Sequence, residues 1–137
     1  MDERERRRAI TVAIDPADVG RYLADRLDAP VTVESVTRTY PGMSRLTYIV
    51  RATVGGEARG LVVRCDPPGG GIVPLPLRRE FDVYARLYGT AVPVAEPLWF
   101  DESPWLTGGL PLMVREMVDS DLDAARDELT LRERHVA

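Results

Sequence analysis

Two residues of opposite charge, Arg64 and Glu80, have the types and the spacing to act together. Residues 61–65 read Leu-Val-Val-Arg-Cys, which predicts a short apolar strand with a cation near its end. A helix expected at 77–88 carries apolar side chains on one face of a 3.6-residue period: Leu77, Phe81, Tyr84 and Tyr88. Glu80 falls within this stripe, and a carboxylate on a buried face needs a cation as its partner. We therefore expect an ion pair between Arg64 on the strand and Glu80 on the helix.

An arginine held in this way could do chemistry, because its planar fork of donors stays charged and can clamp a phosphate group. All 18 basic residues of the chain are arginine, so any role that another protein gives to lysine falls to arginine here. Two simpler interpretations remain open on the pattern alone. The residues could form a purely structural ion pair, or they could be two separate surface charges.

Composition sets the class of the chain. The 137 residues suffice for one compact domain, and 45% hydrophobic with 29% charged residues is typical of a soluble globular protein. The formal net charge is −4, with 18 basic and 22 acidic residues. No basic field favours nucleic acid or an anionic membrane as a partner.

The remaining compositional signals predict a cytoplasmic protein. The single cysteine, Cys65, excludes an internal disulfide and fits a buried thiol at a strand end. No apolar run of 18 residues is present, and the charged start at 1–8 resembles neither a signal peptide nor a transit peptide.

The order of elements predicts an α+β fold. Asp15 and Pro16 are typical of a helix start, and Pro30 ends that helix. Apolar periodicity and turn residues then predict strands at 31–40, 46–54 and 59–65, followed by the helix at 77–88. Two further strands, at 96–100 and 112–118, and a final helix at 121–134 complete the order. We expect a five-stranded antiparallel sheet with one packed helix and extra helices at both ends. The expected organisation is an N-terminal arm and helix (1–30), a central unit (31–120) and a C-terminal helix or tail (121–137).

Several segments, in order, resemble one family. They read YPGMSRLTYIV at 40–50, LVVR at 61–64, REFDV at 79–83, VPVAEPLW at 92–99 and GLPLMVREMV at 109–118. This set is similar to the amino-terminal lobe of aminoglycoside-phosphotransferase-like kinases, nearest the branch also fused to acyl-CoA dehydrogenases. The resemblance covers residues 31–120 and implies a protein-kinase-like N-terminal lobe.

The resemblance implies that this lobe binds ATP. Arg64 takes the position of the strand cation that contacts phosphate, and Glu80 that of the helix carboxylate that orients it. A turn would cover the phosphates with Gly42, Met43 and Ser44. A hinge would bond adenine through the backbone of Glu116, Met117 and Val118. Mg²⁺ would accompany the ATP, with its ligands outside this chain.

Departures from the family pattern limit what the resemblance implies. Arg115 stands before the hinge, where the family usually has an apolar residue, and we expect it to crowd or charge an adenine pocket. The family's catalytic loop carries His-x-Asp, followed by a metal-binding Asp. The only histidine here is His135, and Val136 and Ala137 follow it. We therefore expect no catalytic residue and no metal ligand in this chain, which would be a truncated lobe that is inactive alone.

Two functions from different classes follow. The first is the ATP-binding lobe of a small-molecule phosphotransferase, with a C-terminal lobe or partner chain supplying catalysis. The alternative is a non-catalytic binding or assembly module derived from such a lobe. In either case an uncovered strand at 112–118 and the helix from 121 favour a homodimer.

Overall fold

Alternating and periodic apolar residues build one sheet with a helix on each side. The computed structural model describes residues 14–39, 46–66, 76–118 and 121. Its elements, in order, are α2 (Pro16–Leu27), β1 (Val31–Arg38), β2 (Leu46–Val54), β3 (Glu57–Cys65), α3 (Leu77–Leu87), β4 (Pro97–Asp101), the 3₁₀ helix η1 (Trp105–Thr107) and β5 (Leu112–Glu116). The expected α+β class and five-stranded sheet are confirmed.

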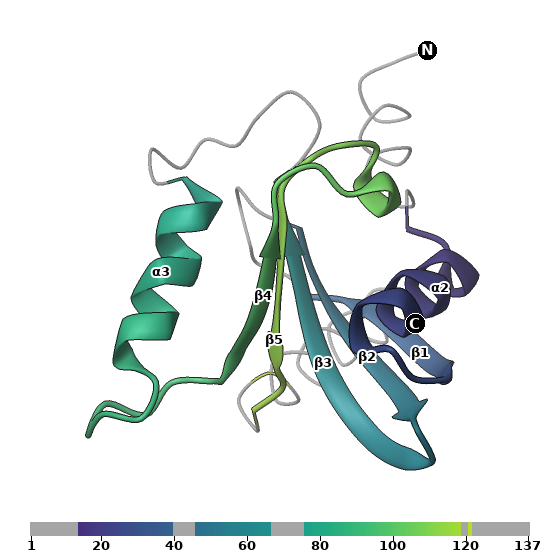
Figure 1. Ribbon diagram of the computed structural model, residues 1–137, viewed down its shortest axis with the longest axis horizontal. Helices are drawn as coiled ribbons and strands as arrows, with labels where there is room; N and C mark the ends of the chain where they lie inside the picture. The colour runs from purple at the N-terminus through teal and green to yellow at the C-terminus, as the bar shows by residue number, and fades with distance from the viewer. Residues whose placement is uncertain (1–13, 40–45, 67–75, 119–120, 122–137) are drawn as a thin grey trace, which may run out of the picture.

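All neighbouring strands pair antiparallel, in the order β1-β2-β3-β5-β4. In Figure 1, α2 lies beside β1 and β2, whereas α3 lies beside β4 at the other end of the sheet. The last strand among the described residues, β5, is thus inserted between β3 and β4. Residues distant in sequence, on β3 and β5, become direct neighbours.

Helix α2 begins where its sequence predicts. The Asp15 side chain accepts a hydrogen bond from the Ala17 amide at 2.7 Å, and Pro16 occupies the first turn. The helix ends at Leu27, before Pro30, because the next residue, Asp28, has a left-handed φ of 50°. One stripe of α2 is buried: Val19, Tyr22 and Leu23.

The core lies between α2 and the sheet. Alternate residues of the three central strands point toward α2 and are buried there, namely Leu46, Tyr48, Val50 and Ala52 of β2, Leu61, Val63 and Cys65 of β3, and Leu112 and Val114 of β5. Because side chains alternate between the faces of a strand, the residues between these point to the opposite face. A one-residue slip of any strand would exchange the two sets, so this pattern fixes the register.

Element boundaries differ from expectation at a few places. Strand β3 starts at Glu57 rather than 59, because the turn at Gly55 and Gly56 leaves Val54 and Glu57 paired directly. The helix predicted at 77–88 ends at Leu87, and Tyr88 is 50% exposed, so Tyr88 does not belong to the buried stripe.

Two further differences concern the second half of the chain. The strand expected at 96–100 runs from Pro97 to Asp101, and the strand expected at 112–118 ends at Glu116, where β4 no longer runs alongside it. The helix expected at 121–134 lies outside the described residues, apart from Asp121. No helix in the described part of the chain is long and apolar enough to cross a membrane.

A polar network ties α2 to β4. The Tyr22 hydroxyl donates to Asp101 at 3.0 Å and accepts from the Trp99 indole nitrogen at 3.0 Å. Arg26 pairs with the same carboxylate at 2.7 Å. Burial raises the pKa of Tyr22 to about 12, so the hydroxyl stays protonated and available as a donor. The network therefore holds α2 against β4.

We predict that Tyr22→Phe lowers the free energy of unfolding by about 1–2 kcal/mol, because two part-buried polar groups, the Trp99 indole nitrogen and the Asp101 carboxylate, lose their shared partner. Tyr88→Phe, at a half-exposed tyrosine, is the matched control and should change little. Urea unfolding of both variants measures the difference. Equal stabilities for the two would show that the Tyr22 hydroxyl does not link the elements.

Candidate functional site

The predicted ion pair between Arg64 and Glu80 is present. On β3, Arg64 lies between Val63 and Cys65, which point to the α2 side, so its own side chain leaves the opposite face of the sheet. Glu80 stands in the first turn of α3. Arg64 Nη1 donates to Glu80 Oε1, and the side chains are only 21% and 17% exposed. A charged strand residue is thus fixed in direction by a helix on the same face.

Helix α3 is held to the sheet along a narrow seam. Leu77 is fully buried at its first turn. Phe81 lies 6.2 Å from the Phe100 ring of β4, centroid to centroid. Most of the other α3 residues are half-buried or exposed. The Arg64–Glu80 pair adds a charged link between α3 and β3 to this small apolar seam.

We predict that Glu80→Gln destabilises the fold by about 1–3 kcal/mol, since it leaves the charge of a mostly buried guanidinium without its carboxylate. Asp82→Asn, on the exposed side of the same helix, removes an equal charge and should have little effect. Thermal unfolding of the two variants is the comparison. A Glu80→Gln protein as stable as Asp82→Asn would contradict this role for the pair.

A second arginine occupies the same face. Arg115 on β5 pairs in register with Val62, two residues from Arg64 on β3, so the two arginines are diagonal neighbours. Arg115 is the one charged residue that is buried among those the structure describes, at 7% exposure. Its guanidinium binds Asp121 through both terminal nitrogens, at 2.8 and 2.9 Å, and lies 6.0 Å from the centre of the Tyr84 ring.

The charges of this region act on one another. Burial alone would lower the pKa of Arg115, but the hydrogen bonds and charge of Asp121, with Tyr84 and Glu80, raise it above its ordinary value. The influence of Glu80 shows that the two ion pairs lie within electrostatic range. Arg64, Glu80, Arg115 and Asp121 therefore form one four-charge cluster, which is neutral in sum.

The carboxylate of Asp121 is held in its charged form. Burial alone would raise its pKa, but the hydrogen bonds from Arg115 and from the Val118 amide, and the charges of Arg115 and Arg64, lower it below its ordinary value. The sequence pattern predicts Asp121 only as the start of a helix. The signal that points to its role is Arg115 itself, a cation inside an apolar strand that requires a carboxylate.

The three expected hinge residues are the last residue of β5, Glu116, and the two residues that follow it. The Glu116 amide donates to the Glu96 carbonyl at 2.9 Å, toward β4, and the Met117 amide donates to the Gly60 carbonyl at 3.1 Å, toward β3. The Val118 amide turns back and donates to Asp121 Oδ2 at 2.9 Å. The backbone therefore continues as an extension of β5 beyond the end of β4.

The side chains of this extension are also fixed. The Glu116 carboxylate pairs with Arg59 of β3. Met117 covers Gly60, where an added Cβ would meet the Met117 Cε at 2.4 Å. Glycine at position 60 therefore lets Met117 lie directly on β3.

Other expected site residues fall outside this arrangement. Gly42, Met43 and Ser44 lie outside the described residues, so the structure says nothing of their position relative to Arg64. Cys65 is buried on the α2 side, and burial raises the pKa of its thiol to about 12, which makes it a poor nucleophile.

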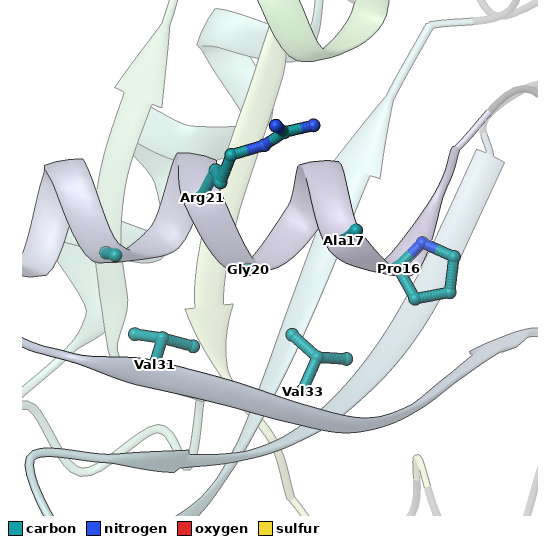
Figure 2. A pocket seen from close by; sticks show the side chains of 7 residues that line it. Pro16, Ala17, Gly20, Arg21, Val31 and Val33 are labelled. Carbon is teal, nitrogen blue, oxygen red and sulfur yellow. The ribbon is translucent and has the colours of Figure 1, made fainter.

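Within the described part of the chain, one hollow adjoins each of the helices α2 and α3, and neither is lined by Arg64. A groove of about 420 Å³ lies between α2 and β1, lined by small and apolar residues with Arg21. Figure 2 shows the Arg21 side chain leading away from β1. The second hollow, of about 330 Å³, is lined by α3 residues that include Glu80 and Tyr84. Within the described ranges, no group of three His, Cys, Asp or Glu residues could hold a metal ion.

No protein-family model matches the chain, and no curated protein matches it.

We predict that the Asp121 carboxyl titrates below the ordinary aspartate pKa of about 3.9. Because folding lowers its pKa, the Arg115–Asp121 pair stabilises the protein above that pH and loses its contribution as the pH falls through the lowered value. Carboxyl carbon NMR measures the titration, with Arg115→Met as the comparison. A midpoint that does not rise in Arg115→Met would contradict the electrostatic role of Arg115.

Proposed function

We propose that this chain is the ATP-binding lobe of a small-molecule phosphotransferase of the aminoglycoside-phosphotransferase-like kind. The observation that carries the proposal is the Arg64–Glu80 pair, which joins a central strand to a helix across one face of the sheet. A guanidinium aimed by a carboxylate is suited to neutralise and position phosphate oxygens.

The donors of Arg64 support this assignment. Nη1 is engaged by Glu80, whereas Nε is buried and has no hydrogen-bond partner among the described residues. A buried donor without an acceptor costs free energy, and a phosphate oxygen would satisfy it. Glu80 would act as a positioning residue that keeps the guanidinium in place when ATP is absent.

The base of the nucleotide would lie against the extension of β5. Its backbone offers a carbonyl at Glu116 and an amide at Val118, the two kinds of group that an adenine edge can bond. The turn residues Gly42, Met43 and Ser44 would cover the phosphates, as the resemblance implies. Mg²⁺ would arrive with ATP, and the proposal assigns it no ligand among the described residues.

Titration calorimetry with ATP tests the proposal. Arg64→Ala should weaken ATP binding by roughly 10- to 100-fold, the equivalent of about 1.5–3 kcal/mol for hydrogen bonds to a charged group. Arg21→Ala removes an exposed cation of α2 and should leave the affinity nearly unchanged. Equal losses in the two variants would indicate a nonspecific charge effect, and no ATP binding by the unaltered chain would refute the proposed function.

A further inference from the structure

At the end of β5, no strand of the described part of the chain runs beside the backbone on the β4 side. Hydrogen-bond directions alternate along it, with the Glu116 amide facing Glu96 and the Met117 amide facing Gly60. The Val118 amide therefore returns to the β4 side, but β4 begins at Pro97, which is paired with Arg115. No described strand lies beside Val118, so a carbonyl at 116 and an amide at 118 need partners from outside the sheet.

Side chains of the same segment supply both partners. Arg115 Nη1 donates to the Glu116 carbonyl at 3.1 Å, and Asp121 Oδ2 accepts from the Val118 amide at 2.9 Å. The two side chains are joined by their own bidentate contact. Together they present a donor to the carbonyl and an acceptor to the amide, as one ligand would.

Adenine presents the same combination of a hydrogen-bond donor beside an acceptor. Its exocyclic N6 is a donor and the adjacent ring nitrogen N1 is an acceptor, whereas hypoxanthine has an acceptor at O6 and a donor at N1. We propose that the Arg115–Asp121 pair is an internal competitor that occupies the adenine edge of the site, and that a nucleotide binds there only when this pair has moved aside. This inference rests on the proposed function.

The pair adjoins an exposed part of the chain. The Asp121 and Arg115 side chains are 14% and 9% exposed, and Val118, whose amide Asp121 binds, is 39% exposed. When only a fraction of molecules has the edge free, the apparent dissociation constant rises by the inverse of that fraction. Removing the pair should therefore tighten binding without any new contact to the ligand.

The test is binding of adenosine and ATP to the full chain and to the double variant Arg115→Met/Asp121→Ala. Replacing a buried ion pair by an apolar side chain of similar length often preserves stability. Both ligands should bind about tenfold more tightly to the variant, and inosine should gain nothing. Asp121→Asn weakens the contact with Arg115 while keeping the shape of the side chain. It should give a smaller gain in affinity for adenosine and ATP and no gain for inosine. It replaces the double variant if that protein does not fold.

A matched control separates competition at the adenine edge from a general effect of charge. Asp18→Asn removes an exposed carboxylate on α2 and should not change adenosine binding. If ATP gains affinity in the variants but adenosine does not, the pair acts only through charge and the competitor is refuted. If ATP binding depends on Arg64 but is unchanged in both variants, the competitor is refuted while the proposed function stands. If neither variant nor the unaltered chain binds ATP, the proposed function fails as well.

Discussion

Two guanidinium groups on one face of the sheet each require a carboxylate partner, and this requirement determines how other parts of the chain pack there. Arg64 and Arg115 project from neighbouring strands β3 and β5, and both are largely or wholly withdrawn from water. Removing a cation from water costs several kcal/mol unless a carboxylate and further hydrogen bonds compensate it. Each arginine therefore has to be met by a carboxylate from another part of the chain.

The two carboxylates determine where those parts lie. Glu80 brings the first turn of α3 over β3, although the apolar seam of this helix is narrow. Asp121 brings the chain back to β5 and at the same time satisfies the Val118 amide. The opposite face of the sheet is covered by α2, mainly with apolar side chains. The ion pairs on that side, Arg26–Asp101 and Arg59–Glu116, are partly exposed. The α2 side thus holds the apolar core, and the other face holds the more deeply buried charges.

Much of this arrangement is predictable from sequence, because local patterns agree with tertiary contacts. The bounds of β2 at 46 and 54 follow from alternation and flanking turn residues, and the Arg64–Glu80 pair follows from a charge placed within an apolar stripe. The strand order is not predictable in this way, since inserting β5 beside β3 depends on contacts between residues distant in sequence. From the sequence, Arg115 is expected to crowd or charge an adenine pocket. Its pairing with Asp121 is not predictable, because Asp121 lies beyond the strand in a segment expected to be helical.

A nucleotide on the charged face of the sheet, as we propose, would contact Arg64 and the extension of β5. Nitrogen NMR with increasing ATP, observing arginine side chains as well as amides, measures where the ligand binds. We expect the largest shifts at the Arg64 guanidinium and at the amides of Glu116, Met117 and Val118. Shifts confined to the groove between α2 and β1, at Gly20 and Val33 (Figure 2), would place the ligand on the other face and refute this proposal.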